Sequence, residues 1–438
     1  MKPINVGLLG LGTVGGGTLT VLRRNQEEIT RRAGREIRVT MAAVRDTEKA
    51  NKYAGDGLKI TTNPLDIVDN PDIDIVVELI GGIEPAKDLV MMAIENGKHV
   101  VTANKALVAK YGNEIFAAAQ AKGVMVSFEA AVAGGIPIIK ALREGLTANR
   151  IEWIAGIING TSNFILSEMR DKGSSFEDVL KEAQRLGYAE ADPTFDIEGI
   201  DAAHKLTIMS AIGFGVPMQF DKAYTEGISK LTRDDIQYAE ELGYRIKLLG
   251  ITRWTPEGIE LRVHPTLIPA KRLIANVEGV MNAILVKGDA VGATMYYGAG
   301  AGAEPTASSV VADLVDVTRM HTADPGNRVP HLAFQPDALS DEPILPMSEV
   351  RTSYYLRLCA LDKPGVLADI TRILADLGIS IDAMVQKEPR EGEVQVNIII
   401  LTHITVEKYI DAAIAKIEAL SSISGKVTRI RLEELNKN

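Results

Sequence analysis

The residues best suited to acid–base chemistry lie together between positions 187 and 205. Asp201 and Lys205 are four residues apart in a segment, 200–212, that is apolar on almost every side. That composition predicts a buried helix, on which residues four apart share one face. An Asp–Lys pair with this spacing is usually a solvent-exposed salt bridge. Burial favours a functional role instead, because a buried charge is costly and tends to be kept for chemistry.

Burial also changes what the lysine can do. A desolvated lysine has a lowered pKa, which makes it a usable proton donor and acceptor near neutral pH. Asp201 would oppose that shift while holding the ammonium group in place. Glu190 and Asp196 add two carboxylates on the preceding loop, and such a cluster suits the amino group of an amino-acid substrate. Outside this pattern, the same two carboxylates would be interpreted as solvated loop residues.

A glycine-rich turn near the N-terminus is the second chemical signal. Gly-x-Gly-x-x-Gly follows an apolar run, 4–9, and precedes a helical pattern that extends to about Arg32. In order, the three glycines permit a tight turn, close approach of the backbone to a pyrophosphate, and close helix–strand packing. A turn without a ligand has the same string, but its position between strand and helix favours a dinucleotide site, with the anion at the helix N-terminus. The residues assigned to this site are Gly10, Gly12, Thr13, Val14 and Gly15.

The second expected strand bears on which dinucleotide binds. It ends in Val44-Arg45-Asp46. An acidic residue at this point accepts a hydrogen bond from the ribose 2′-hydroxyl of NAD, whereas an arginine pairs with the 2′-phosphate of NADP. Arg45 comes first, so we expect NADP, with NAD as the alternative.

The elements that position these residues predict an α/β protein of three domains. Apolar strands alternate with helices in the first part of the chain, which indicates a Rossmann-type, doubly wound parallel sheet. We expect these strands at 4–9, 39–44, 73–78, 99–102 and 124–128, and helices at 85–96 and 110–122. This domain is assigned to residues 1–133 and is completed by a helix at 305–320. Residues 134–304 mix helices with β-rich stretches such as 259–267 and 283–291, which predicts an α+β catalytic and dimerisation domain.

The last part of the chain begins with a connection. Residues 321–348 are rich in proline, which is typical of a linker. Residues 349–438 then follow a strand–helix–strand–strand–helix–strand order, the pattern of a ferredoxin-like domain, with a charged turn at 389–393. We therefore expect a truncation near Pro346 to keep catalysis.

Composition excludes several classes of protein. The 438 residues carry a net charge of −10 with no Lys/Arg-rich block, so no nucleic acid is expected as a partner. No apolar run approaches the roughly 18 residues of a membrane helix. A single cysteine, Cys359, allows no disulfide within the chain and fits a reducing, cytoplasmic location. The six histidines form no helical pair, so a transition-metal catalyst is not expected.

The segment around Lys205 resembles the signature of the homoserine dehydrogenase family. The matching positions are Gly187-Tyr188, Asp192-Pro193, Asp196-Ile197, Gly199, Asp201 and Lys205. Residues 159–165 and 102–105 resemble further blocks of that family, and the likeness extends in the expected order over residues 5–320.

This resemblance implies roles for individual residues. Lys205 corresponds to the proton donor and acceptor, and Lys105 to a lysine near nicotinamide and substrate. The implied substrate-binding residues are Glu190, Asp201, Asp196 and Thr161. The implied cofactor-binding residues, besides the glycine-rich turn and Arg45, are Thr102, Lys105, Gly187 and Gly302. A monovalent cation such as Na⁺ would be held mostly by backbone carbonyls of Glu129, Val132, Gly134 and Ile136.

The implied reaction is reversible, NAD(P)-dependent hydride transfer between L-homoserine and L-aspartate 4-semialdehyde, a step toward threonine and methionine. During reduction a lysine would protonate the developing alkoxide, with Lys105 or a positioned water stabilising its charge. Whether a lysine or a water carries the proton directly stays open at this point.

Residues 361–367 and 377–381 resemble the ACT domain, a regulatory amino-acid-binding module. Pro364-Gly365 turns the chain into a helix whose N–H groups could hold a carboxylate. The resemblance implies an amino-acid effector, for which we expect L-threonine, and pairing into a homodimer or homotetramer. The alternative is a dimerisation domain with no ligand.

Two other functions share part of this domain pattern. A 3-phosphoglycerate dehydrogenase also joins a dinucleotide domain to an ACT domain, but its Arg/Glu/His catalytic set is not evident in this sequence. An amino-acid sensor with an inactive dinucleotide domain would have no need of Lys105, Glu190, Asp201 and Lys205 together.

Overall fold

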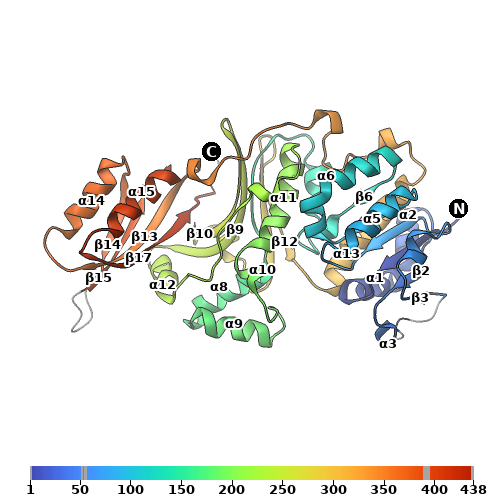
Figure 1. Ribbon diagram of the computed structural model, residues 1–438, viewed down its shortest axis with the longest axis horizontal. Helices are drawn as coiled ribbons and strands as arrows, with labels where there is room; N and C mark the ends of the chain where they lie inside the picture. Colours follow the sequence, from blue (N-terminus) through green and yellow to red (C-terminus); the bar gives the residue numbers. More distant parts are fainter. Residues whose placement is uncertain (1, 51–52, 54–56, 388–394, 436–438) are drawn as a thin grey trace.

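The computed structural model describes residues 2–50, 53, 57–387 and 395–435 of the chain. Its parts lie in a row, with the N-terminal sheet at one end, the C-terminal module at the other and helix α11 (Ile200–Phe214) between them (Figure 1). Within these described ranges no helix is long and apolar enough to cross a membrane.

The N-terminal sheet is parallel and has the strand order β3-β2-β1-β4-β5-β6. Its direction of growth reverses between β1 and β4, which confirms the predicted doubly wound Rossmann type and places a ligand beyond the carboxyl ends of these strands. The strands are β1 (Ile4–Leu9), β2 (Ile37–Ala43), β3 (Lys59–Thr61), β4 (Ile75–Glu78), β5 (His99–Thr102) and β6 (Val126–Ser127). Strand β3 was not predicted, because this short edge strand has no buried side chain.

Helices cover both faces of this sheet. They are α1 (Thr13–Arg24), α2 (Gln26–Ala33), α3 (Thr47–Ala50), α4 (Leu65–Val68), α5 (Ala86–Glu95), α6 (Lys105–Lys122) and, from far along the chain, α13 (Ala303–Met320). The prediction of one helix to Arg32 was wrong, because the chain leaves helical geometry at Asn25. Helix α13 packs directly on α1, where a Cβ on Gly17 would lie 2.4 Å from the Ala303 carbonyl oxygen.

A second sheet has eleven strands, and its main path runs β12-β11-β7-β9-β10-β17-β13-β15-β14. The first five strands of this path are β12 (Gly292–Ala299), β11 (Met281–Gly288), β7 (Ile151–Ile157), β9 (Tyr244–Thr255) and β10 (Gly258–Pro269), and β8 (Tyr224–Thr225) pairs with β10. The β-rich stretch expected at 283–291 is a hairpin that turns after Gly288, where the next strand begins at Gly292. The helices of this region are α7 (Ile138–Lys140), α8 (Gly160–Lys172), α9 (Phe176–Arg185), α10 (Thr194–Ile197), α11 and α12 (Arg233–Glu241).

The C-terminal module has the ferredoxin-like order that was predicted. Its elements are β13 (Arg351–Leu361), α14 (Val366–Asp376), β14 (Ile381–Gln386), β15 (Gln395–Thr402), β16 (Thr405–Val406), α15 (Glu407–Glu418) and β17 (Ile423–Leu432). The turn expected at 389–393 lies outside the described residues. The module does not keep its own sheet, because β17 pairs in parallel with β10 and places Thr266 opposite Arg431.

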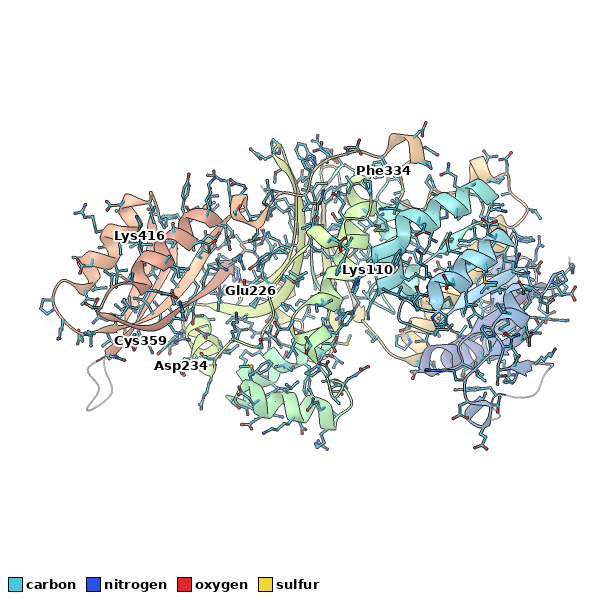
Figure 2. All side chains as sticks on the ribbon, viewed as in Figure 1. Lys110, Glu226, Asp234, Phe334, Cys359 and Lys416 are labelled. Atoms are coloured by element: carbon cyan, nitrogen blue, oxygen red, sulfur yellow. The ribbon has the colours of Figure 1, made fainter. Side chains whose placement is uncertain are left out.

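The proline-rich segment, which was predicted to be a linker, is attached to the catalytic region along its course. Ile259 donates to the Pro343 carbonyl and accepts from the Leu345 N–H, both at 2.8 Å. Phe334 lies against the C-terminal end of α11, where a Cβ on Gly215 would be 2.7 Å from its ring (Figure 2). A truncation near Pro346 would remove β17 from β10, and the expectation that it keeps catalysis stays a prediction.

Candidate active site

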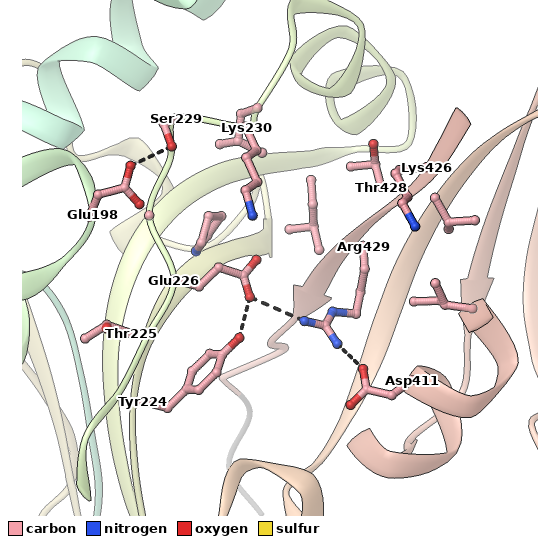
Figure 3. A pocket seen from close by; sticks show the side chains of 16 residues that line it. Glu198, Tyr224, Thr225, Glu226, Ser229, Lys230, Asp411, Lys426, Thr428 and Arg429 are labelled. Carbon is pink, nitrogen blue, oxygen red and sulfur yellow. Dashed lines mark hydrogen bonds and ion pairs between the residues drawn. The ribbon is translucent and has the colours of Figure 1, made fainter. Parts of the chain in front are cut away.

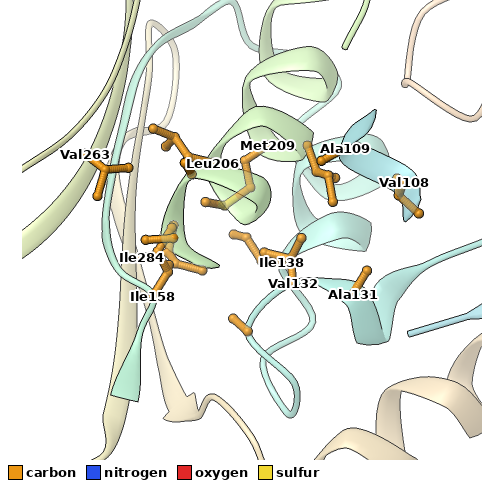
Figure 4. Packing of buried hydrophobic residues seen from close by; sticks show 14 of the residues in the cluster. Val108, Ala109, Ala131, Val132, Ile138, Ile158, Leu206, Met209, Val263 and Ile284 are labelled. Atoms are coloured by element: carbon orange, nitrogen blue, oxygen red, sulfur yellow. The ribbon is translucent and has the colours of Figure 1, made fainter. Parts of the chain in front are cut away.

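Helix α11 carries the predicted acid–base pair and is buried along its length. It begins after Gly199 and ends at Gly215, both with left-handed backbone geometry, at φ +80° and +65°. Leu206 and Met209 pack among apolar residues that include Val108 of α6 (Figure 4). The helix therefore lies between α6 and strands β9 and β10 of the second sheet. The expectation of a buried helix is confirmed.

Asp201 lies between two lysines. Its Oδ2 is 2.8 Å from Lys205 Nζ, and its Oδ1 is 2.6 Å from Lys105 Nζ. Lys205 Nζ also donates to the Ile158 carbonyl oxygen at 2.8 Å. An ammonium group has three N–H donors, so Lys205 keeps one donor for another partner. The structure thus brings together Lys105 and Lys205, which the sequence places on different helices.

The two lysines differ in how their environment acts on them. Burial lowers the pKa of Lys205, and the charge of Asp201 opposes that shift only in part. Burial acts to lower the pKa of Lys105 as well. The carboxylates of Asp201, Asp196 and Glu190 outweigh that effect, so the pKa of Lys105 is raised. Burial would raise the pKa of Asp201, yet the two ammonium groups hold it well below its usual range. Lys205 is consequently the easier of the two lysines to deprotonate.

Asn159 holds the acidic side chains in place. Its Nδ2 donates to Asp196 Oδ1 at 2.7 Å and to Asp201 Oδ2 at 2.9 Å. Its Oδ1 accepts from the Ser162 N–H at 2.8 Å and so caps α8. Asn159 was not among the site residues predicted from the sequence. Asn followed by Gly-Thr-Ser is an N-cap pattern, which was the available signal.

The loop that carries Gly187 and Glu190 borders this cluster. Thr161 Oγ1 donates to the Tyr188 carbonyl at 2.6 Å, so its hydroxyl proton fixes the loop. Glu190 is exposed, and its charge acts on Lys105. Asp196 is partly buried, which raises its pKa.

The glycine-rich turn is shaped as a cradle. Gly10 has φ +102°, and a Cβ there would lie 2.8 Å from the Leu79 carbonyl oxygen. A Cβ on Gly15 would lie 2.4 Å from the Gly10 carbonyl oxygen. Helix α1 begins at Thr13 without a side-chain cap and without an acidic residue in its first turn. Uncapped N–H groups and close backbone approach are what a dinucleotide pyrophosphate requires, so these residues fit that group.

Arg45 lies exposed just past the end of β2. This is the place beside which the adenosine ribose binds in a doubly wound dinucleotide fold. Asp46, the competing acidic residue, accepts a hydrogen bond from the Glu48 N–H at 3.1 Å within the same turn.

A buried acidic residue at the end of β4 positions Lys105 indirectly. Glu78 accepts from the Ile80 N–H at 2.8 Å and from Thr102 Oγ1 at 2.7 Å. Thr102 Oγ1 in turn accepts from the Asn104 N–H at 3.0 Å, and Asn104 caps α6, of which Lys105 is the first residue. Glu78 was not among the residues predicted from the sequence. A carboxylate that ends an otherwise apolar strand was the signal for it.

The residues expected around a monovalent cation form a tight turn. The Glu129 carboxylate accepts the N–H groups of Ile139 and Lys140, both at 2.8 Å. The Gly134 carbonyl accepts from Ser309 Oγ at 2.6 Å, and the Ile136 carbonyl accepts from Ile138 at 2.8 Å. Carbonyl oxygens have two lone pairs, so these groups keep acceptor capacity. Within the described ranges no cluster of three or more His, Cys, Asp or Glu side chains could hold a metal ion.

Comparison with known proteins identifies all three parts of the chain. Residues 10–129 match the family model for the NAD-binding domain of homoserine dehydrogenase, residues 137–315 the model for homoserine dehydrogenase, and residues 354–422 the ACT domain. A homoserine dehydrogenase of Pseudomonas aeruginosa is 66% identical over 437 residues, with 100% of each chain covered.

Solved structures agree. The crystal structure of a homoserine dehydrogenase from Thiobacillus denitrificans has a TM-score of 0.96 and 80% identity, and the match covers 100% of this chain and 99% of that one. A hyperthermophilic archaeal homoserine dehydrogenase in complex with NADPH has a TM-score of 0.63 and 26% identity, over 72% of this chain and 98% of that one. The chain belongs to the homoserine dehydrogenase family, a family of NAD(P)-dependent oxidoreductases.

Proposed function

We propose that the chain interconverts L-homoserine and L-aspartate 4-semialdehyde with NADP, as a step toward threonine and methionine. The observation that carries this proposal is the pair of ammonium groups on one buried carboxylate, Lys105 and Lys205 around Asp201. We further divide the chain into a dinucleotide domain (1–133, with helix 305–320), a catalytic domain (134–304), a connection (321–348) and an effector module (349–438).

Lys205 is suited to move the proton at the substrate oxygen. Two of its N–H groups are held by Asp201 and the Ile158 carbonyl, which leaves one donor for the substrate. Its lowered pKa favours release of a proton to a developing alkoxide. Lys105, with its raised pKa, stays charged and stabilises the same oxygen electrostatically. A water held between them is an alternative direct carrier.

The remaining carboxylates suit the other end of the substrate. Asp196 and Glu190 border the cluster and lie close enough to raise the pKa of Lys105. A second ammonium group, that of an amino-acid substrate, would be attracted by the same charges. Thr161 and Gly187 would contribute to substrate binding through the loop that the Thr161 hydrogen bond to the Tyr188 carbonyl holds in place.

For the cofactor, the glycine-rich turn would hold the pyrophosphate, while Gly302, Thr102 and Lys105 would lie near the nicotinamide end. When bound, the dinucleotide accepts or supplies the hydride. NADP is favoured because Arg45 is exposed at the end of β2, and because the archaeal relative is a complex with NADPH. A monovalent cation such as Na⁺ would bind the carbonyls of Glu129, Val132, Gly134 and Ile136.

For regulation, we assign L-threonine to the turn at Pro364-Gly365 of the C-terminal module, in a cytoplasmic homodimer or homotetramer. Gly365 has φ +95° and directly precedes α14, which has no side-chain cap. An amino-acid carboxylate would satisfy the first N–H groups of that helix.

The test follows nicotinamide absorbance when purified protein is given L-homoserine with NADP, and separately with NAD. Activity with L-homoserine is expected for the wild type, with a loss of about 100-fold or more in Lys205→Ala. Lys181→Ala, on the exposed face of α9, serves as the matched control. Wild-type protein that leaves the absorbance unchanged with both cofactors would refute the proposal.

A further inference from the structure

A pocket of about 650 Å³ lies where the C-terminal module meets the catalytic region, apart from the site around Lys205 (Figure 3). One wall comes from residues 224–231 together with Glu198, and the other from β17 and α15. Its volume is within the range of pockets that bind small molecules.

Charges of both signs line this interdomain pocket in equal number. The cations are Lys230, Lys426 and Arg429, and the carboxylates are Glu198, Glu226 and Asp411. Equal numbers of opposite charges favour a zwitterion over an anion or a cation, since each end of a zwitterion finds an opposite charge.

Most of these charges are already paired, and the exceptions are informative. Arg429 pairs with Glu226 at 3.4 Å and with Asp411, and Lys426 pairs with Glu418 at 2.6 Å. The ammonium of Lys230 reaches the pocket and makes no ion pair with any described residue (Figure 3). On the same wall as Lys230, Glu198 uses Oε1 to accept from Ser229 Oγ at 2.6 Å and keeps acceptor capacity on its carboxylate.

We propose that this pocket binds a free α-amino acid, with its carboxylate on Lys230 and its ammonium on Glu198. The site is separate from the Pro364-Gly365 turn and does not depend on that turn binding an effector.

The position of Glu198 links this pocket to the active site. Glu198 lies between Asp196, which contacts Asn159, and Gly199, which begins α11. The Ile228 N–H donates to the Ile197 carbonyl at 2.9 Å, and a Cβ on Gly227 would be 2.4 Å from that same oxygen. A ligand on Glu198 would therefore act on the tightly packed turn that sets the start of α11 and the place of Asp201.

The opposite wall belongs to the C-terminal module, through Arg429 on β17. A ligand in the pocket would thus contact the regulatory module and the segment before α11 at once. We expect its binding to change the rate of homoserine oxidation as well as the stability of the contact between domains.

The test measures binding of L-threonine, L-methionine, L-isoleucine and L-lysine to the full chain by isothermal titration calorimetry. At least one is expected to bind wild type, and its affinity should fall about 10-fold or more in Lys230→Met and in Glu198→Gln, because each removes a charged contact. Lys426→Met is the matched control, since that ammonium is held by Glu418, and it should change affinity less than 2-fold, about the scale of an exposed ion pair. The amide of the bound amino acid and its deaminated analogue should both bind weakly.

Three results would overturn the proposal: no binding of any of the four amino acids, equal affinity in Lys230→Met and wild type, or full affinity for an analogue with one charge. A ligand lost in Gly365→Ala but retained in Lys230→Met would occupy the turn of the module. That outcome would reject the interdomain pocket and leave the proposed effector site standing.

Discussion

Two clusters of buried charge lie on the two faces of the eleven-stranded sheet and differ in how their charges are paired. At the junction with the C-terminal module, the guanidinium of Arg262 donates to Glu260 at 2.8 Å and to Glu433 at 2.6 Å, and it contacts His264 Nε2 at 2.7 Å. In the catalytic cluster, two lysines share the single carboxylate of Asp201.

The difference separates a structural role from a chemical one. Arg262 has its donors engaged on three partners, and the two carboxylates raise the pKa of its guanidinium, although burial acts to lower it. Lys205 keeps one donor, and its pKa is lowered by burial rather than raised by its partner. A buried cation held between two carboxylates has a structural role, whereas a buried cation with a free donor and a lowered pKa is available for chemistry.

The strongest test of this contrast is Arg262→Met. The substitution would leave Glu260 and Glu433 buried without their central partner, and breaking a buried ion pair typically costs about 3–5 kcal/mol. We expect the free energy of unfolding, measured in urea, to fall by about that amount. A loss below about 1 kcal/mol would show that the network contributes little to stability.

The same substitution at Lys205 should affect turnover more than stability. In Lys205→Met the carboxylate of Asp201 keeps Lys105 as a partner at 2.6 Å, so we expect the free energy of unfolding to fall by less than in Arg262→Met. Turnover with L-homoserine should fall by about 100-fold or more, while binding of the dinucleotide is retained. Stopped-flow rates and fluorescence titration of the cofactor separate the two effects, and unaltered turnover would contradict the role of Lys205.

Arg45 offers a smaller effect, at the other end of the cofactor. Arg45→Ala should weaken NADP binding by about 10-fold or more, the scale of a lost charge-assisted hydrogen bond, and leave NAD nearly unchanged. Lys59→Ala, on the exposed edge strand β3, is a control of the same charge. Equal losses for both cofactors, or none for either, would show that Arg45 does not select between them.

The smallest expected effect is a shift in the pH profile. Oxidation of homoserine needs a neutral lysine, so its rate should rise with pH, with an apparent pKa below that of an ordinary lysine, because burial lowers the pKa of Lys205. The charge of Asp196 raises that pKa. Asp196→Asn should therefore move the rise to lower pH, and a rise that moves to higher pH would contradict this electrostatic account.

Much of the catalytic region follows from local patterns. The apolar composition of 200–212 predicted α11 and its burial, and the glycine spacing predicted the turn before α1. The boundary at Asn25 and the short strand β3 escaped prediction, because neither carries a periodic apolar signal.

Contacts between distant segments were beyond local patterns. Asn159 joins Asp196 to Asp201 across the start of two helices, and no spacing in the sequence predicts which side chains a capping residue will also reach. The attachment of β17 to β10 was likewise unexpected. The proline density of 321–348 indicates a connection but not the surface on which that connection lies.

The amino-acid sequence alone was enough to specify the candidate proton-transfer residues, Asp201 and Lys205, since helical periodicity places residues four apart on one face. The partners of these buried charges depended on packing. Lys105 arrives from α6 to make the second ion pair, and Ile158 supplies a carbonyl from the end of β7. The pKa of a lysine depends on its desolvation and on its neighbours in space. The lowered pKa of Lys205 and the raised pKa of Lys105 therefore depend on the tertiary packing around α11.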